Sequence, residues 1–177
     1  MPRSRYRFVG DDAPYFMTMT VNNWLPVFTR PESAAAVFDS WRWPQEHEEI
    51  RLHGYVILEN HLHLIAQAPH IGKVVQRSKS YTARRIIDHL EANRASRLLE
   101  LLSMFKRDYK NQSEHQLWEE GSHPQRIEQD AVMRQKLDYI HHNPVKRSYV
   151  DLPEHWRWSS ARDYAGMPGL IAVDREW

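Results

Sequence analysis

The chain has 177 residues, of which 41% are hydrophobic and 27% are charged, a composition typical of a globular protein large enough to bury its own core. It contains no cysteine, which excludes disulfides and thiolate metal sites. No apolar run is long enough to span a bilayer, and the first residues lack the apolar core of a secretion signal, so we expect a cytoplasmic protein. The net charge of +1 does not by itself indicate a polyanionic partner.

The first part of the chain predicts three strands and one helix. An alternating pattern rich in aromatic and β-branched residues predicts a strand over 15–21. Apolar residues at helical spacing predict an amphipathic helix that begins near Pro31 and ends before Pro44. Two further strands are expected over 52–58 and 61–68, joined by a short turn.

The rest of the chain predicts helices with one weak strand between them. Residues 73–105 have a helical pattern that is interrupted near 93–96, and a last helix is expected over 131–142. A short strand is expected near 117–118 or 126–127. This order of elements predicts an α+β, ferredoxin-like (RRM-like) antiparallel sheet with helices packed on one face. We expect one domain over residues 1–177, with the tail from about 150 to 177 packed on it.

Two histidines stand two residues apart in the expected strand over 61–68. Because alternate side chains of a strand point to the same face, His61 and His63 would project together, as a divalent-metal pair requires. Ordinary strand histidines with hydrogen-bonded neighbours give the same pattern. Their neighbours are largely apolar, so the rings need either partners or a cation. Glu59 has the same parity as His61 and is a further candidate ligand.

The last expected helix carries a tyrosine and an amide four residues apart. Lys136, Tyr139 and Asn143 share a polar stripe next to an apolar stripe that would pack on the sheet. A cation held by two histidines and an amide, beside a tyrosine, is suited to cutting a phosphodiester through a covalent phosphotyrosine. Tyr81 and Tyr109 are rival nucleophiles, and an isolated boundary tyrosine is more often only a packing residue.

Basic side chains gather on the helix that begins near residue 73 and around the tyrosine helix. Such groups can neutralise phosphates, although they also occur on solvated helix faces. The candidate DNA-binding residues are Lys79, Arg84, Arg85, Lys136, Lys146 and Arg147.

Three motifs in this order resemble one known family. They are ENHLHLIAQAP at 59–69, Leu117-Trp118-Glu119, and LDYIHHNPVKRSYVDLPEHWRWSSARDYAG at 137–166. Over roughly residues 12–166 the chain is similar to the single-tyrosine HUH transposases, and specifically to their REP-associated tyrosine transposase branch. The resemblance implies an enzyme that cuts and rejoins single-stranded DNA at hairpin repeats.

The resemblance also implies the site residues. His61 and His63 would be metal ligands for Mg or Mn, Asn143 the third ligand, and Tyr139 the nucleophile of a 5′-phosphotyrosine intermediate. Tyr81 matches no motif position. The resemblance says nothing definite about oligomeric state, and monomer and homodimer both stay open.

The chain departs from the family pattern in places that bear on the third ligand. Glu59 stands where the family usually has proline, and His142 is a rival to Asn143. Pro144 disfavours helical geometry at the residue before it. Two other functions stay open: a single-stranded nucleic-acid-binding protein without catalysis, and a metal-dependent phosphoesterase that uses water as its nucleophile.

Overall fold

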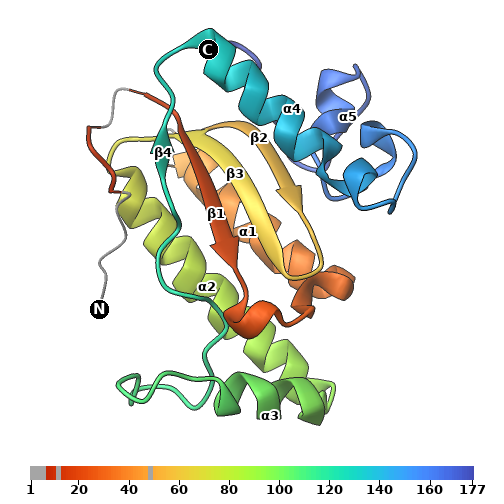
Figure 1. The fold of residues 1–177 in the computed structure, drawn as a ribbon. Coiled ribbons are helices and arrows are strands. Elements are labelled where there is room, and N and C mark those ends of the chain that lie inside the picture. Colours follow the sequence, from red (N-terminus) through yellow and green to blue (C-terminus); the bar gives the residue numbers. More distant parts are fainter. Residues whose placement is uncertain (1–6, 11–12, 48–49) are drawn as a thin grey trace.

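The computed structural model describes residues 7–10, 13–47 and 50–177. Its centre is a four-stranded antiparallel sheet with the order β2-β3-β1-β4 (Figure 1). This is the strand order of a ferredoxin-like sheet, so the predicted α+β class is confirmed. The strands are β1 (Tyr15–Thr20), β2 (Arg51–Ile57), β3 (His61–Gln67) and β4 (Gln125–Arg126).

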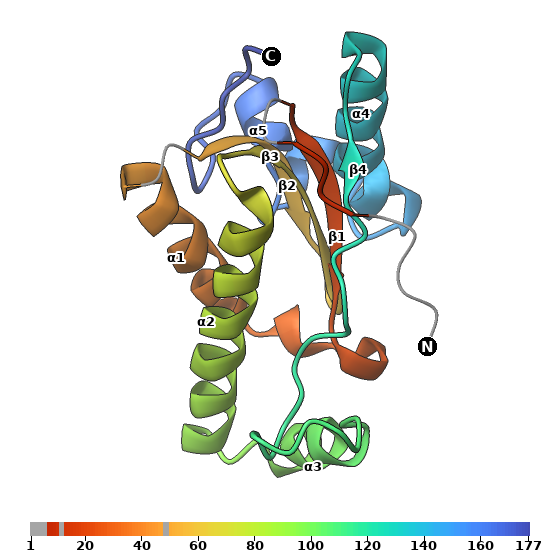
Figure 2. The ribbon, with the colours of Figure 1, turned by 90° about the vertical axis from the view of Figure 1, so that its left-hand side faces the viewer.

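Helices cover both faces of the sheet rather than one. Figure 2 shows α1 and α2 on one side and α4 on the other, so the expectation that all helices share a face is wrong. Among the described residues, no helix is both long and apolar enough to cross a lipid bilayer. The helices are α1 (Pro31–His47), α2 (Ile71–Ala92), α3 (Ser96–Met104), α4 (Asp130–Lys146) and α5 (Ala161–Tyr164), with 3-10 turns at Asn22–Trp24, Val27–Thr29 and Pro153–His155.

The alternation along β3 explains the two-sided packing. Leu62, Leu64 and Ala66 lie in the larger core, which is covered by α1 and α2. Ile65 points to the opposite face, where it joins Phe16 and an apolar stripe of α4 in a smaller core. A strand with apolar residues on both faces is buried on both faces, which requires a helix on each. The stripe of α4 consists of Met133, Leu137 and Ile140.

Two helices continue through a proline at which they were expected to end or distort. Pro44 lies inside α1 and Pro144 inside α4, and both are buried. Each proline sits in the last turn of its helix, where losing one backbone hydrogen bond costs little because few later bonds remain. As a result, Asn143 keeps helical geometry and stays on the same face of α4 as Tyr139.

Helix α4 lies close against β2 at a glycine. A Cβ atom added at Gly54 would lie 2.6 Å from Leu137 Cδ2 and 3.1 Å from Ile140 Cδ1. A side chain there would force Leu137 to move, either by its own rotation or with the helix. The glycine therefore leaves room for the buried Leu137 of the tyrosine helix to pack directly on β2.

The C-terminal tail closes the free edge of β2. Ser159 forms a bridge with Val56, and the hydroxyl of Ser160 accepts a hydrogen bond of 2.9 Å from the backbone N–H of Tyr55. The same hydroxyl lies 2.9 Å from Nε2 of the buried His141 on α4. Ser160 therefore ties the tail to both the sheet and the tyrosine helix, and the motif Trp-Ser-Ser has a structural role.

We expect Ser160→Ala to lower the free energy of unfolding by about 2–4 kcal/mol, because it leaves a buried N–H and a buried imidazole nitrogen without their partner. Ser159→Ala is the matched control. In the described structure this equally buried hydroxyl accepts one bond, from the N–H of Ala161, so its loss should cost about 1 kcal/mol. Urea unfolding of both variants checks the difference. Equal losses would show that the hydroxyl of Ser160 is not the link described.

Candidate active site

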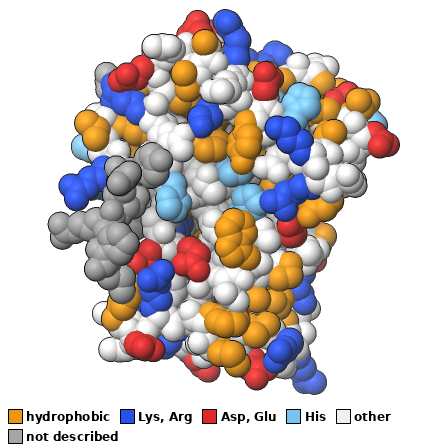
Figure 3. Space-filling model, viewed as in Figure 1, with side chains coloured by type: hydrophobic (Ala, Val, Ile, Leu, Met, Phe, Trp, Pro, Cys, Tyr) orange, Lys and Arg blue, Asp and Glu red, His pale blue; other side chains and the backbone are white. Residues whose placement is uncertain are grey.

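The two histidines of β3 lie side by side on the face of the sheet covered by α4. Residues His61 and His63 pair with Thr20 and Thr18 of β1, and their ring centroids are 5.0 Å apart. Both side chains are buried, with only 4% of each exposed. In the space-filling view of this face, histidine side chains lie near the middle, among hydrophobic and basic side chains (Figure 3).

Hydrogen bonds orient both rings through Nδ1 and do not use Nε2. Nδ1 of His61 lies 2.7 Å from Oδ1 of Asn60, which can only accept, so the ring proton sits on Nδ1. Nδ1 of His63 lies 2.9 Å from the hydroxyl of Thr18. Nε2 of His63 is buried and has no hydrogen-bond partner in the described part of the chain. A buried nitrogen of this kind fits a metal ligand, because a cation would satisfy its lone pair.

Both imidazoles are neutral at physiological pH. Burial, reinforced by the positive charge of Arg147, lowers the pKa of His61 to about 4. Burial also lowers the pKa of His63 to about 3, with smaller contributions from His61, Arg147 and Lys136. A neutral imidazole offers the free lone pair that a divalent cation needs.

Tyr139 lies directly against this pair. Its ring centroid is 5.3 Å from that of His63 and 6.1 Å from that of Phe16, both in edge-to-face geometry. The side chain is nevertheless 43% exposed, so the phenol is accessible from solvent. Lys146 lies above the ring, with Nζ 5.8 Å from its centroid. The structure thus places an accessible tyrosine beside the histidine pair, and its role as the nucleophile stays a prediction.

Asn143 is held on the same helix by a charged neighbour. Its side chain is largely buried, and Oδ1 accepts a hydrogen bond of 3.0 Å from Nε of Arg147. Nη1 of Arg147 in turn donates to Oε1 of Glu59 at 2.8 Å. The rival ligand His142 is exposed, and its Nδ1 bonds the carbonyl of Asp138 in its own helix.

No three histidine, cysteine, aspartate or glutamate side chains of the described residues lie close enough to hold one ion. Glu59 therefore does not join the histidine pair as a ligand in this arrangement. An amide such as that of Asn143 is compatible with this result, and its role as third ligand stays a prediction.

The candidate DNA-binding residues divide between the two sides of the sheet. Lys136, Lys146 and Arg147 belong to α4 and the residue that ends it, beside the histidine pair. Arg84 and Arg85 are exposed on α2, in the other helical layer, so the structure does not bring them to this site. Contact of any of these residues with DNA stays a prediction.

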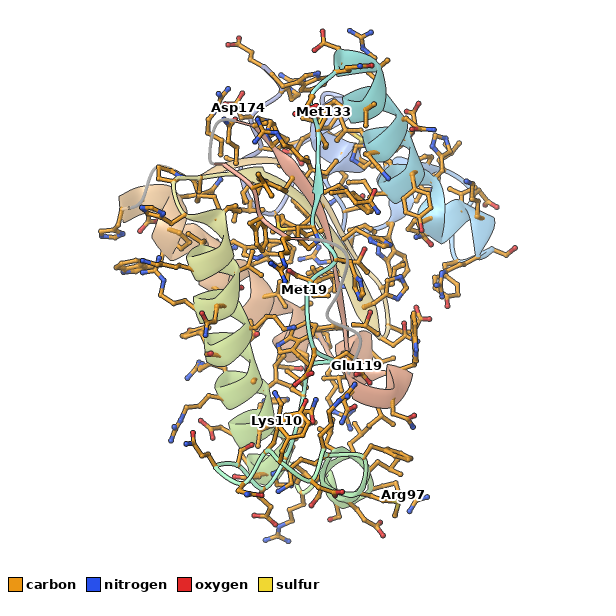
Figure 4. All side chains as sticks on the ribbon, turned by 60° about the vertical axis from the view of Figure 1, so that its left-hand side comes forward. Met19, Arg97, Lys110, Glu119, Met133 and Asp174 are labelled. Carbon is orange, nitrogen blue, oxygen red and sulfur yellow. The ribbon has the colours of Figure 1, made fainter. Side chains whose placement is uncertain are left out.

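Lys79 has a structural role that the sequence did not indicate. Its ammonium donates hydrogen bonds of 2.7 Å to the backbone carbonyls of Glu119 and Gly121, and burial lowers its pKa to about 8. It thus fastens the segment that leads into β4. Figure 4 shows Glu119 and Lys110 toward the α3 end of the molecule, well apart from Met133 on α4.

The rival tyrosines lie away from the histidines. Tyr81 is on α2, where it lines a small apolar groove together with Trp43 of α1. The hydroxyl of Tyr109 donates to the carboxylate of Glu120. Of the three candidates, the described structure brings Tyr139 to the histidine pair.

Trp24 lies beside the histidine pair, and the sequence reasoning did not single it out. Its ring centroid is 5.5 Å from that of His61, and 58% of the side chain is exposed. Both Asn23 and Trp24 adopt left-handed backbone angles, with φ of 53° and 57°, which is rare for two successive residues other than glycine. The motif Val-Asn-Asn-Trp contains Asn residues that tolerate this geometry, the one local signal available.

The fold and the site together define the class of the protein: a ferredoxin-like sheet that presents a histidine pair to a tyrosine-bearing helix on its second face. A scan of the chain against known protein-family profiles finds no match. A curated protein of Haemophilus influenzae, which carries the provisional name REP-associated tyrosine transposase, is 28% identical over 135 residues. The match covers 71% of this chain and 72% of that protein.

One solved structure supports the same relationship at the level of the fold. A REP-associated tyrosine transposase bound to a REP hairpin superposes with a TM-score of 0.64 at 18% identity, over 100% of this chain and 94% of the other. A Deinococcus radiodurans structure provisionally described as a transposase gives a TM-score of 0.46 at 18% identity, over 80% of this chain and 97% of the other. The chain therefore resembles a REP-associated tyrosine transposase in sequence and shares the fold of another whose structure is known.

Proposed function

We propose that this chain is a metal-dependent single-stranded DNA endonuclease and strand transferase that acts on hairpin repeats through a 5′-phosphotyrosine on Tyr139. The observation that carries the proposal is the contact between Tyr139 and His63, whose buried Nε2 has no hydrogen-bond partner in the described chain. The similar protein of known structure is bound to a REP hairpin, which supports the same kind of DNA as substrate here.

His61 and His63 would hold the cation, with the amide oxygen of Asn143 as the proposed third ligand. When bound, Mg²⁺ or Mn²⁺ offsets the negative charge that develops on the phosphate oxygens. The hydrogen bond that His61 donates to Asn60, and the one between His63 and Thr18, orient the two rings for this role before any ion binds.

Tyr139 would attack the phosphorus atom in line with the leaving oxygen. A bond forms between its phenolic oxygen and phosphorus, and the bond from phosphorus to the 3′-oxygen breaks. The phenol's proton passes through solvent to that oxygen, which leaves a free 3′-hydroxyl. The phosphotyrosine ester keeps the free energy of the broken bond, so another 3′-hydroxyl can reverse the step without ATP. Lys136, Lys146 and Arg147 surround the site with positive charge that attracts the DNA backbone.

Trp24 supplies an exposed aromatic face beside the metal ligands. The backbone N–H of Asn23 donates to Oε1 of Glu119 at 3.1 Å, which fastens the strained turn. A base next to the scissile phosphate would lie near His61 and could stack on this ring. We therefore assign Trp24 the role of a stacking platform for an unpaired base.

We expect Trp24→Ala to weaken binding of single-stranded DNA by about 1–3 kcal/mol, and Trp24→Phe to keep most of the affinity. Trp43→Ala is the matched control, because Trp43 is similarly exposed but lies on α1, in the other helical layer. Fluorescence anisotropy with a labelled oligonucleotide measures both. Unchanged affinity in Trp24→Ala would remove this role.

The direct test of the proposed function uses single-stranded DNA hairpins from the genomic flanks of the gene. The protein is incubated with labelled DNA and Mg²⁺ or Mn²⁺, with or without chelator, and the products are separated on a denaturing gel. A metal-dependent, SDS-stable protein–DNA adduct is the expected result. DNA that binds without any adduct, under every metal tested, would favour the binding protein without catalysis.

A further inference from the structure

The turn between β2 and β3 reaches the tyrosine helix through one ion pair. Oε1 of Glu59 accepts a hydrogen bond of 2.8 Å from Nη1 of Arg147, and Nε of the same guanidinium donates to Oδ1 of Asn143 at 3.0 Å. The two charged side chains are largely shielded, with 23% and 35% of their surface exposed. A planar guanidinium that bonds two acceptors at once fixes the orientation of both.

The turn itself is well anchored. The carbonyl of Glu59 accepts a hydrogen bond of 2.9 Å from the N–H of Phe28, and the carbonyl of Asn60 accepts one of 2.9 Å from the N–H of Val21. The side chain of Asn60 also orients His61. This two-residue turn therefore contacts His61 on β3 directly and Asn143 on α4 through Arg147.

The charge of Glu59 also suits a cation site next to an arginine. Arg147 lies close enough to act electrostatically on both histidines, and its positive charge alone would repel a metal ion. The carboxylate of Glu59 offsets that charge. Oε2 of Glu59 is buried without a hydrogen-bond partner in the described chain, but no group of three acidic or histidine ligands forms around it.

We propose that Glu59 is a positioning residue that acts through Arg147 to hold the amide oxygen of Asn143 ready for the cation on His61 and His63. Oδ1 of Asn143 accepts one bond from Arg147 and keeps a second lone pair for an ion. This inference rests on the proposed function. It assigns a role to the residue that stands in place of the family's usual proline.

Mn²⁺ binding, measured by calorimetry without DNA, tests the inference in a double-mutant cycle of Glu59→Gln and Asn143→Ala. About 0.5 M salt screens long-range charge effects. Glu59→Gln should weaken Mn²⁺ binding about tenfold in the otherwise unchanged protein, the usual cost of losing a group that orients a ligand. In the Asn143→Ala background it should change binding less than about twofold, because its target is gone.

Two further variants sharpen the test. Arg147→Lys keeps the charge but loses the planar fork, and should weaken Mn²⁺ binding about as much as Glu59→Gln. Glu128→Gln, which breaks an exposed ion pair with Arg126, is the control and should have no effect. Thermal unfolding of each metal-free variant separates loss of binding from loss of fold.

The outcomes separate this inference from the proposed function. An equal loss of Mn²⁺ affinity from Glu59→Gln in both backgrounds would make Glu59 a direct ligand. It would overturn the inference that Glu59 acts through Arg147 and Asn143. Unchanged binding in both Glu59→Gln and Arg147→Lys would overturn it as well. If the unsubstituted protein does not bind Mn²⁺, or binds it independently of His63, the proposed metal-dependent function is wrong. The positioning role of Glu59 is then wrong as well.

Discussion

Tyr139→Phe is expected to abolish the covalent protein–DNA adduct, lowering its rate of formation by more than about 10³-fold, while DNA binding changes less than about twofold. The substitution removes only the phenolic oxygen. The ring keeps its contacts with Phe16, His63 and Lys146, so the fold and the surrounding charge stay as they are. Denaturing gels report the adduct, and anisotropy reports binding.

Tyr81→Phe is the matched control for this experiment. Both tyrosines are 43% exposed, but Tyr81 lies on α2, on the other side of the sheet from the histidine pair. We expect it to cleave and form adducts normally. Loss of the adduct in Tyr81→Phe, or its persistence in Tyr139→Phe, would show that Tyr139 is not the nucleophile. Metal-dependent cleavage that continues without an adduct in Tyr139→Phe would favour a phosphoesterase that uses water.

His63→Ala is expected to weaken Mn²⁺ binding by more than about 100-fold and to abolish cleavage. Loss of a direct ligand should exceed the 10–100-fold effect typical of groups that only orient ligands. His142→Ala is the control, because His142 is exposed and bonds the backbone of its own helix. If His142→Ala loses the metal and His63→Ala keeps it, the assignment of ligands is wrong.

The pH dependence of metal binding gives a second readout for the same pair. Protons compete with the cation for the imidazole lone pairs, and burial lowers the pKa of His61 to about 4 and of His63 to about 3. In the folded protein these two histidines therefore take up protons only well below the ordinary histidine pKa of 6.5. Mn²⁺ binding should stay nearly constant from pH 7 to about 5 and fall as the pH approaches 4. A midpoint near 6.5 would indicate exposed histidines.

The same shifts affect folding. Because both pKa values are lower in the folded state than in the unfolded chain, the unfolded state binds protons first as the pH falls. The stability contributed by the neutral rings is complete above pH 6.5 and is lost as the pH falls through the folded pKa values. Acid unfolding followed with and without Mn²⁺ at pH 5–7 would show the bound ion opposing this loss.

The strands were predictable because a period of two is a local property of the sequence. The alternation in β3 predicted that His61 and His63 share a face, and the smaller core formed with Ile65 on that face confirms the alternation. The side of the sheet on which each helix lies was not predictable in this way. The apolar stripe of α4 fits either face, and the choice depends on Phe16 and Ile65 offering a second apolar surface.

The residues of the candidate site also differ in whether local sequence patterns could identify them. Its motif residues, His61, His63 and Tyr139, could be named from spacing and family resemblance, since each motif lies within a few residues. Trp24 could not, because it meets His61 across 36 intervening positions only when the turn after β1 is folded. The structural role of Lys79 was equally hidden, because the two backbone carbonyls that its ammonium bonds lie about 40 residues further along the chain.

The sequence by itself determined which segments form strands, that two histidines share one strand face, and that the tyrosine and its amide lie one helical turn apart. All of these depend on local periodicity. Only the tertiary structure decided that the histidines and Tyr139 meet on one face, and that Arg147 joins Glu59 to Asn143. Contacts between distant segments depend on how layers pack, and packing is settled by the burial of whole surfaces rather than by any one motif.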